Sequence, residues 1–238
     1  MSRFTLLADE LWCAEDDLRT APGVVFPIRM TVLRHASALT LVSPIAIDDA
    51  VATFLAELGS VEAIVAPNAM HHVHLPSTVE RYPDARVFGV PGLRKKRREI
   101  VFDEMLSDGA APFHPGVELH SVDGAPTMDE RVLYHRASRT LIVTDLIFNM
   151  PSAANWISRL IFRYVARALG KPAQSRLWRS FTKDRAAAGE SIARLLELDF
   201  DRLVMAHGEV IPQGGREVLA EATTWMREGQ TDRLPAPA

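Results

Sequence analysis

Cysteine is nearly absent from this chain: Cys13 is the single one among 238 residues. One thiol can form neither an internal disulfide nor a zinc site built from several cysteines. A chain without disulfides fits a reducing compartment, so we expect a cytoplasmic location.

Long apolar runs are also lacking. No stretch approaches the roughly 18 apolar residues of a membrane-spanning helix. The segment from Met1 to Glu10 has one basic and two acidic residues and no long apolar run, so it is not predicted to be a signal peptide. Neither sign of charge is in large excess, because the net charge is −3 and the isoelectric point is near 6.2. That balance argues against a nucleic-acid partner and against a global affinity for membranes.

The chain does contain enough apolar residues for a core. Hydrophobic residues make up 47% and charged residues 24%, as in globular proteins. A length of 238 residues is ordinary for one α/β domain, and no repeat or internal linker is visible. We therefore predict a single domain over residues 1–228 and a disordered C-terminal tail over residues 229–238.

Strands and helices are expected in a similar order in both halves of the chain. In the first half we predict a hairpin of strands 28–34 and 38–42, a helix at 48–59, and strands at 61–66 and 86–90. In the second half we predict a strand at 117–122 and a hairpin of strands 131–135 and 140–144. Helices at 155–169 and 184–197, a strand at 202–206 and a helix from 215 onward follow. Two sheets packed face to face with helices outside would bury all these apolar faces. We therefore expect an α/β fold arranged as a four-layer αββα sandwich.

Chemically active side chains follow three of the predicted strands. One strand leads into Met70-His71-His72-Val73-His74, a second ends at Asp145, and a third is followed by His207. A zinc or iron site needs three or four histidine and carboxylate groups within roughly 2.0–2.2 Å of one ion. The candidate metal ligands are therefore His71, His72, His74, Asp145 and His207. The alternative is an exposed histidine loop, a capping aspartate and a structural histidine.

A basic stretch runs from Arg159 to Arg185 with Asp184 as its one acidic residue. An apolar stripe accompanies its first part, over residues 157–169. Such a helix could make weak peripheral contact with an anionic membrane through residues 155–169, or bind an acidic ligand. The alternative is a surface helix whose stripe packs on the core. The shorter basic run at residues 94–98 is expected to be a solvated helix face.

Several segments resemble the metallo-β-lactamase superfamily, and more closely a bacterial family of proteins of unknown function with that fold. They lie within residues 29–211 and read RMTVLR, LVSPIAID, LGSVEAIVAPNAMHHVHL, RYPDARVFGVPGLRKK, VLYHRASRTLIVTDLIFN and VMAHGEVI. Catalytic members of the superfamily carry His-x-His-x-Asp-His after a strand. Here Asn68 and Met70 stand where its first two histidines belong, His72 stands at the aspartate position, and Val73 stands at the last histidine.

The resemblance therefore implies a degenerate metal site. A further histidine of the superfamily is missing near Pro126, whereas Asp145 matches its bridging aspartate and His207 its last histidine. His72 is a plausible substitute ligand, with His71 and His74 in reserve. The thioether of Met70 is a poor ligand for zinc or iron(III), which argues against a two-metal site. One zinc or iron ion is the expected cofactor.

Two functions remain open at this point. The first is a single-metal hydrolase acting on a small ester, thioester, lactone or phosphoester, with Asp145 and His72 as catalytic residues. In that case whichever of His72 and His71 is not a ligand would be the general base. The second is a protein of the same fold that has lost its metals and binds a small molecule or a protein in a pocket that includes Asn68 and Met70. Of the two we favour the hydrolase, and the sequence does not choose among its possible substrates.

Overall fold

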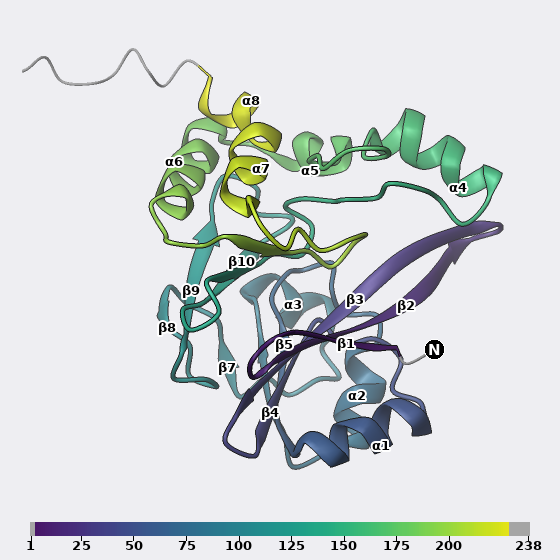
Figure 1. Ribbon diagram of the computed structural model, residues 1–238, viewed down its shortest axis with the longest axis vertical. Helices are drawn as coiled ribbons and strands as arrows, with labels where there is room; N and C mark the ends of the chain where they lie inside the picture. Colours follow the sequence, from purple (N-terminus) through teal and green to yellow (C-terminus); the bar gives the residue numbers. More distant parts are fainter. Residues whose placement is uncertain (1–2, 229–238) are drawn as a thin grey trace, which may run out of the picture.

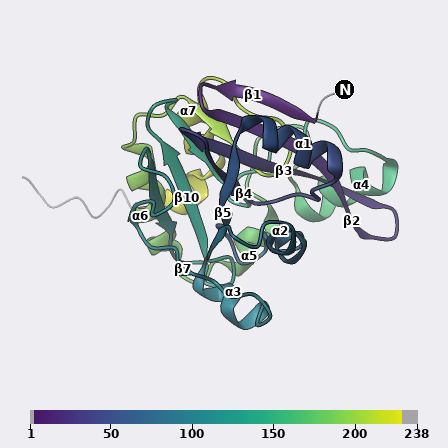
Figure 2. The same ribbon diagram turned by 90° about the horizontal axis from the view of Figure 1, so that it is seen from below.

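Two β-sheets lie face to face, with helices on both outer faces, in the computed structural model, which describes residues 3–228 (Figures 1 and 2). The predicted αββα sandwich is therefore confirmed. The tail predicted for residues 229–238 lies outside the described residues.

The first sheet has the strand order β1-β2-β3-β4-β5-β6-β7. Its strands are β1 (Phe4–Ala8), β2 (Leu11–Ala21), β3 (Val24–His35), β4 (Ala38–Val42), β5 (Ser60–Ala66), β6 (Arg86–Gly89) and β7 (Glu104–Met105). The strands from β1 to β4 are antiparallel, whereas those from β4 to β7 are parallel. The carboxyl ends of the parallel strands consequently share one edge of the sheet.

The second sheet has the order β12-β11-β10-β9-β8. Its strands are β8 (Gly109–Ala110), β9 (Val117–Val122), β10 (Glu130–His135), β11 (Thr140–Ile142) and β12 (Arg202–Val204). Strands β11 and β12 are parallel and the remaining pairs are antiparallel. The loops after β11 and β12 therefore leave the sheet in the same direction.

Helices cover both outer faces. They are α1 (Asp49–Leu58), α2 (Leu75–Arg81), α3 (Pro91–Lys96), α4 (Trp156–Leu160), the π-helical turn η1 (Ile161–Ala166), α5 (Arg176–Phe181), α6 (Arg185–Leu196), α7 (Gly215–Ala222) and α8 (Thr224–Arg227). Figure 1 shows α1 and α2 beside the first sheet and α6 and α7 beside the second. The segment from α4 to α5 lies on the side of the second sheet and extends toward the outer end of the β2–β3 hairpin.

Three apolar clusters account for this layering. The inner cluster joins the two sheets through buried residues such as Ile64, Phe88 and Leu133. A second packs α6 and α7 on the outer face of β10 and β11, and a third packs α1 on β3 and β4. Burial of these faces, at about 25 cal/mol per Å² of apolar surface, is the main force that holds the layers together.

Most predicted elements are present, with shifted ends. The helix predicted after Asp48 is α1, and the Asp48 carboxylate caps it by accepting from the Val51 N–H at 2.9 Å. The strand predicted at residues 117–122 has those bounds in the structure. The long helix predicted at 155–169 is shorter, because its regular turns give way to η1 and the chain turns at Arg167, whose φ is 53°. No helix among residues 3–228 is long and apolar enough to cross a membrane.

Candidate metal centre

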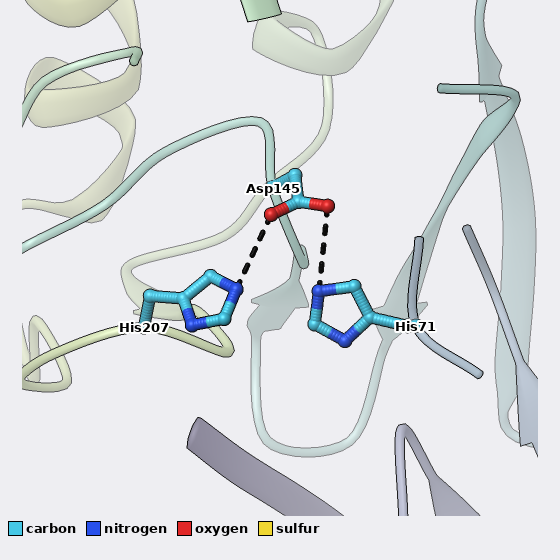
Figure 3. A group of neighbouring side chains, drawn as sticks. All are labelled: His71, Asp145 and His207. Carbon is cyan, nitrogen blue, oxygen red and sulfur yellow. Dashed lines mark ion pairs between the residues drawn. The ribbon is translucent and has the colours of Figure 1, made fainter. Parts of the chain in front are cut away.

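Three loops that leave parallel strands bring one histidine or carboxylate each to a common point. His71 lies on the loop after β5, Asp145 follows β11, and His207 follows β12 (Figure 3). The two sheets thus contribute side chains from both halves of the chain. Their donor atoms all lie within 4.8 Å of one another.

Asp145 lies between the two imidazoles. Its Oδ2 is 3.4 Å from His71 Nε2, and its Oδ1 is 3.2 Å from His207 Nε2. All three side chains are at least nine-tenths buried. Charge-assisted N–H···O bonds are usually shorter, about 2.7–2.9 Å. Donor atoms arranged tetrahedrally 2.0–2.2 Å from one ion stand roughly 3.3–3.6 Å apart. The two imidazole nitrogens stand at 3.4 and 3.2 Å from different oxygens of Asp145, and the three donor atoms lie within 4.8 Å of one another.

The far nitrogen of each ring is held by the protein. His207 Nδ1 donates to the Pro27 carbonyl at 2.8 Å, and His71 Nδ1 contacts the Ser43 hydroxyl. Because a carbonyl only accepts, the neutral form of His207 must carry its proton on Nδ1 and direct a lone pair from Nε2 toward Asp145. A lone pair facing a carboxylate is favourable only with a cation or an added proton between them. Holding a histidine by its second nitrogen is also how metal sites orient their ligands.

Burial and mutual charge shift the pKa values of the three groups. Burial alone would raise the pKa of Asp145, but the neighbouring imidazoles outweigh it and hold that pKa far below its usual value. Burial lowers the pKa of His207, and Asp145 only partly offsets this. Burial also acts to lower the pKa of His71, yet the Asp145 carboxylate and the more distant Glu130 raise it overall. The ionised carboxylate of Asp145 thus faces one imidazole with a raised pKa and one with a lowered pKa.

A second buried carboxylate, Glu130, supports the loop that carries Asp145. Its Oε1 accepts from the backbone N–H groups of Thr144 at 2.8 Å and Leu146 at 3.1 Å. Its Oε2 accepts from Asn68 Nδ2 and Trp178 Nε1, each at 3.3 Å. Burial, with the nearby charge of Asp145, raises the pKa of Glu130 despite these hydrogen bonds. Sequence reasoning missed Glu130 because nothing in its local pattern marks it as buried.

The structure places Asn68 beneath the centre rather than in an open pocket. It is fully buried, and its Nδ2 donates to Asp145 Oδ2 at 2.9 Å. Its Oδ1 accepts from the Met70 N–H at 2.7 Å, which turns the chain directly before His71. Met70 is partly exposed and lies in the walls of the hollows above the centre.

The other two loop histidines lie outside the group. His72 Nδ1 accepts from Arg97 Nε at 2.9 Å, and burial together with Arg97 lowers the pKa of His72. His74 precedes α2, and its carbonyl accepts from Thr78 Oγ1 at 2.7 Å. The basic run expected to be solvated therefore also secures this loop, since Lys96 Nζ donates to the Ala69 carbonyl at 2.9 Å.

Two adjoining hollows open above the centre. The smaller, about 340 Å³, is lined by His71, His207 and Asp145 among others. The larger, about 570 Å³, also reaches Asp145 but has mainly apolar walls. Sites for small molecules commonly have volumes of roughly 300–1,000 Å³. The centre is thus buried at its base and accessible from one side.

The fold is that of the metallo-β-lactamases. A metallo-β-lactamase from Hirschia baltica superposes with a TM-score of 0.64 at 15% identity, over 94% of this chain and 96% of that one. One from Pontibacter korlensis gives 0.65 at 14% identity, over 94% and 98%. FIM-1 from Pseudomonas aeruginosa in its mono-zinc form gives 0.65 at 13% identity, over 96% and 95%. Identities this low support the fold and leave the activity open.

The family follows from the sequence itself. The model of the family described as "Domain of unknown function (DUF4336)" matches residues 8–176, which is more than two thirds of the chain. The chain belongs to this family. No curated protein matches it. The resemblance seen in the sequence, to this fold and to a family of unknown function within it, is thereby confirmed.

Proposed function

We propose that this protein is a hydrolase that uses one metal ion, held by His71, Asp145 and His207. The observation that carries the proposal is the buried imidazole of His207, whose Nδ1 bonds the Pro27 carbonyl at 2.8 Å while its Nε2 faces a carboxylate oxygen at 3.2 Å. Two imidazoles and one carboxylate suit zinc or iron(II). When bound, such an ion would act as a Lewis acid and lower the pKa of a coordinated water toward 7.

The side chains of the protein would have distinct tasks. Ser43 and Pro27 orient the two imidazoles, and Asn68 fixes the carboxylate of Asp145 from below. His72 keeps Nδ1 on Arg97, so it could exchange a proton with substrate only through Nε2. The substrate is a small ester, thioester, lactone or phosphoester that enters by the hollows above the centre.

One ion fits this chain better than two. Among residues 3–228, His71, Asp145 and His207 are the one group of three or more metal-ligating side chains that lie close enough together. Two adjacent cations would need about twice as many donors. The buried Glu130 is already occupied by four hydrogen-bond donors.

Metal content is the direct test. Purified with supplementary zinc or iron, the wild type should carry about one equivalent of metal, and His207→Ala less than about a tenth. His35→Ala, which removes an exposed histidine elsewhere, is the matched control and should keep its metal. The loaded wild type should hydrolyse a panel of ester, thioester, lactone and phosphoester substrates, and His207→Ala should not. Less than a tenth of an equivalent in the wild type would refute the proposal.

Binding without catalysis is the second candidate function. It is favoured by the replacement of a superfamily histidine by Asn68, whose amide is fully engaged with buried carboxylates. A thermal-shift screen separates the two functions, because a ligand raises the melting temperature according to its affinity for the folded state. Stabilisation by an organic ligand and not by zinc or iron would favour binding alone.

A further inference from the structure

The larger hollow is a chamber with an apolar interior. Its walls include Val24, Phe26, Phe148, Ile161, Phe162 and Trp178. The ring of Phe26 packs edge-to-face on Phe148 and Phe162, with centroids 5.8 and 5.1 Å apart. These contacts fix the shape of the chamber in the absence of a ligand.

Several polar groups in the chamber wall have partners within the protein. Trp178 Nε1 donates to Glu130, and Ser175 Oγ accepts from the Trp178 N–H. Arg176 also contributes to the lining, but its side chain is exposed. The interior therefore presents an occupant with apolar surface and few hydrogen-bonding groups.

The chamber is continuous with the space above the metal ligands. The two hollows share five lining residues: Thr20, Phe26, Met70, Asp145 and Leu177. Asp145 thus lies at the boundary between an apolar compartment and the two imidazoles. A substrate whose reacting bond lies at this boundary would direct its apolar part into the chamber.

We propose that the chamber binds an unbranched apolar chain, the acyl chain of an ester or thioester substrate. The assignment of the cleaved bond rests on the proposed hydrolase function, whereas binding of the chain does not. In the hydrolysis, the oxygen of a water molecule bonds to the carbonyl carbon and the C–O or C–S bond breaks. One water proton then goes to the departing alcohol or thiol, and the acid is released.

Chain binding can be measured without metal or turnover. Titration of chelator-treated full-length protein with primary alcohols from butanol to decanol, followed by calorimetry, uses neutral probes that avoid repulsion from Asp145. Affinity should rise about fourfold for each added methylene until the chamber is full. A flat response to chain length would overturn the proposal.

A filled chamber provides the matched test. Ala166 lines the chamber on η1, so Ala166→Trp should abolish the chain-length dependence. Ala56→Trp places the same side chain on the exposed face of α1 and should bind decanol like the wild type. Equal binding by the two variants would place the chain elsewhere and refute the chamber. His71→Ala should lose metal but keep decanol binding, because His71 does not line the chamber, so the chamber and the metal centre can fail independently.

A second inference rests on the surface of the same segment. Between residues 151 and 183 the chain has seven basic residues and no acidic one. Trp156, Leu160, Tyr164 and Val165 are each more than half exposed on α4 and η1. The arginines at 159, 163 and 167 are also exposed among them. Cationic groups interspersed with aromatic and aliphatic side chains match an anionic lipid surface.

We infer that α4 and η1 dock on an anionic membrane. Val165 belongs both to this exposed face and to the chamber lining, so docking would bring the chamber next to the lipid. The protein should sediment with vesicles containing phosphatidylglycerol, less at high salt, and not with pure phosphatidylcholine vesicles.

Charge reversal tests the location of the docking face. Arg159→Glu with Arg163→Glu should reduce vesicle binding more than 25-fold, at about fivefold for each arginine lost. Arg94→Glu with Lys95→Glu makes the same charge change on α3 and should leave binding nearly unchanged. Equal losses in the two double variants, or no binding by the wild type, would refute docking at α4 and η1.

Discussion

Replacement of Glu130 by glutamine should be far more damaging than its conservative size suggests. All four partners of this carboxylate are donors: the N–H groups of Thr144 and Leu146 on one oxygen, and Asn68 Nδ2 and Trp178 Nε1 on the other. A glutamine amide must direct its own N–H groups at one of these pairs. Two hydrogen bonds are then lost. Either both backbone N–H groups or Trp178 Nε1 stay buried without an acceptor, whereas Asn68 Nδ2 keeps Asp145 and Thr144.

The expected loss of unfolding free energy follows from this count. Each buried donor left unsatisfied costs about 1–3 kcal/mol, and removal of a buried charge returns part of it. We expect Glu130→Gln to lose roughly 2–4 kcal/mol near pH 8, which lowers the melting temperature by about 10 °C for a chain of this size. Urea unfolding followed by tryptophan fluorescence measures the loss. Glu62→Gln, at an exposed position of β5, is the matched control and should change stability by less than about 0.5 kcal/mol.

The pH dependence of stability, compared between the wild type and Glu130→Gln, gives a second readout. Because the pKa of Glu130 is raised in the fold, the folded carboxyl binds a proton more tightly than the unfolded one. Wild-type stability should then fall as the pH rises from the ordinary value of 4.5 through the raised pKa, an effect that glutamine cannot show. The advantage of the wild type should be larger near pH 5 than near pH 8. A loss below about 0.5 kcal/mol at pH 8 would refute the four-donor account.

Three further predictions concern the centre itself. Gly208→Ala should lower the free energy of unfolding by roughly 2–4 kcal/mol and weaken metal binding, because a Cβ there would lie 1.8 Å from the Asn149 carbonyl oxygen. Gly170→Ala is the control: its φ is also positive but the space around it is open, so it measures the smaller cost of the backbone conformation alone. Zinc should displace a proton from His71, whose pKa is raised above 6.5, so calorimetry in two buffers should show proton release and affinity should fall as the pH drops through that pKa. Equal zinc affinity near pH 6 and pH 8 would contradict this. In metal-free protein, the ionised Asp145 carboxylate stabilises the fold at pH values above about 3.8, the ordinary pKa of the group, because its pKa in the fold is lower. This stabilisation is lost as the pH falls below 3.8, so the stability of Asp145→Asn should depend less steeply on pH during acid unfolding than that of the wild type.

Most of the buried strands and their order along the chain could be predicted from the sequence. Strands such as β5 and β9 are short, apolar and bounded by turn residues, so their pattern reflects burial directly. The N-terminal strands β1 and β2 were not predicted. The second half of β2 is polar and largely exposed, so a period-two signal is weak there, and pairing with β3 determines its conformation.

The residues of the centre could be predicted as a set but not individually. Asp145 and His207 each follow a short buried strand, and the parallel pairing of β11 with β12 brings their loops together. The loop after β5 has no regular period, and His72 was favoured because the resemblance places it at the aspartate position of the superfamily motif. The turn held by Asn68 directs His71 toward Asp145 instead, while Arg97 holds His72 aside. Such a choice depends on side-chain hydrogen bonds across the fold, which a linear pattern does not contain.

The contacts of Asn68 support the proposal of a single cation. Its Nδ2 lies between two buried carboxylates, 2.9 Å from Asp145 and 3.3 Å from Glu130, and donates to both. Two carboxylates this close repel each other unless positive or hydrogen-donating groups separate them. In the superfamily pattern a metal-binding histidine stands at this position, whereas here a neutral amide supplies the two N–H groups. The protein thereby stabilises the two buried carboxylates with its own hydrogen bonds, and under the proposed function an ion is needed only between Asp145 and the imidazoles of His71 and His207.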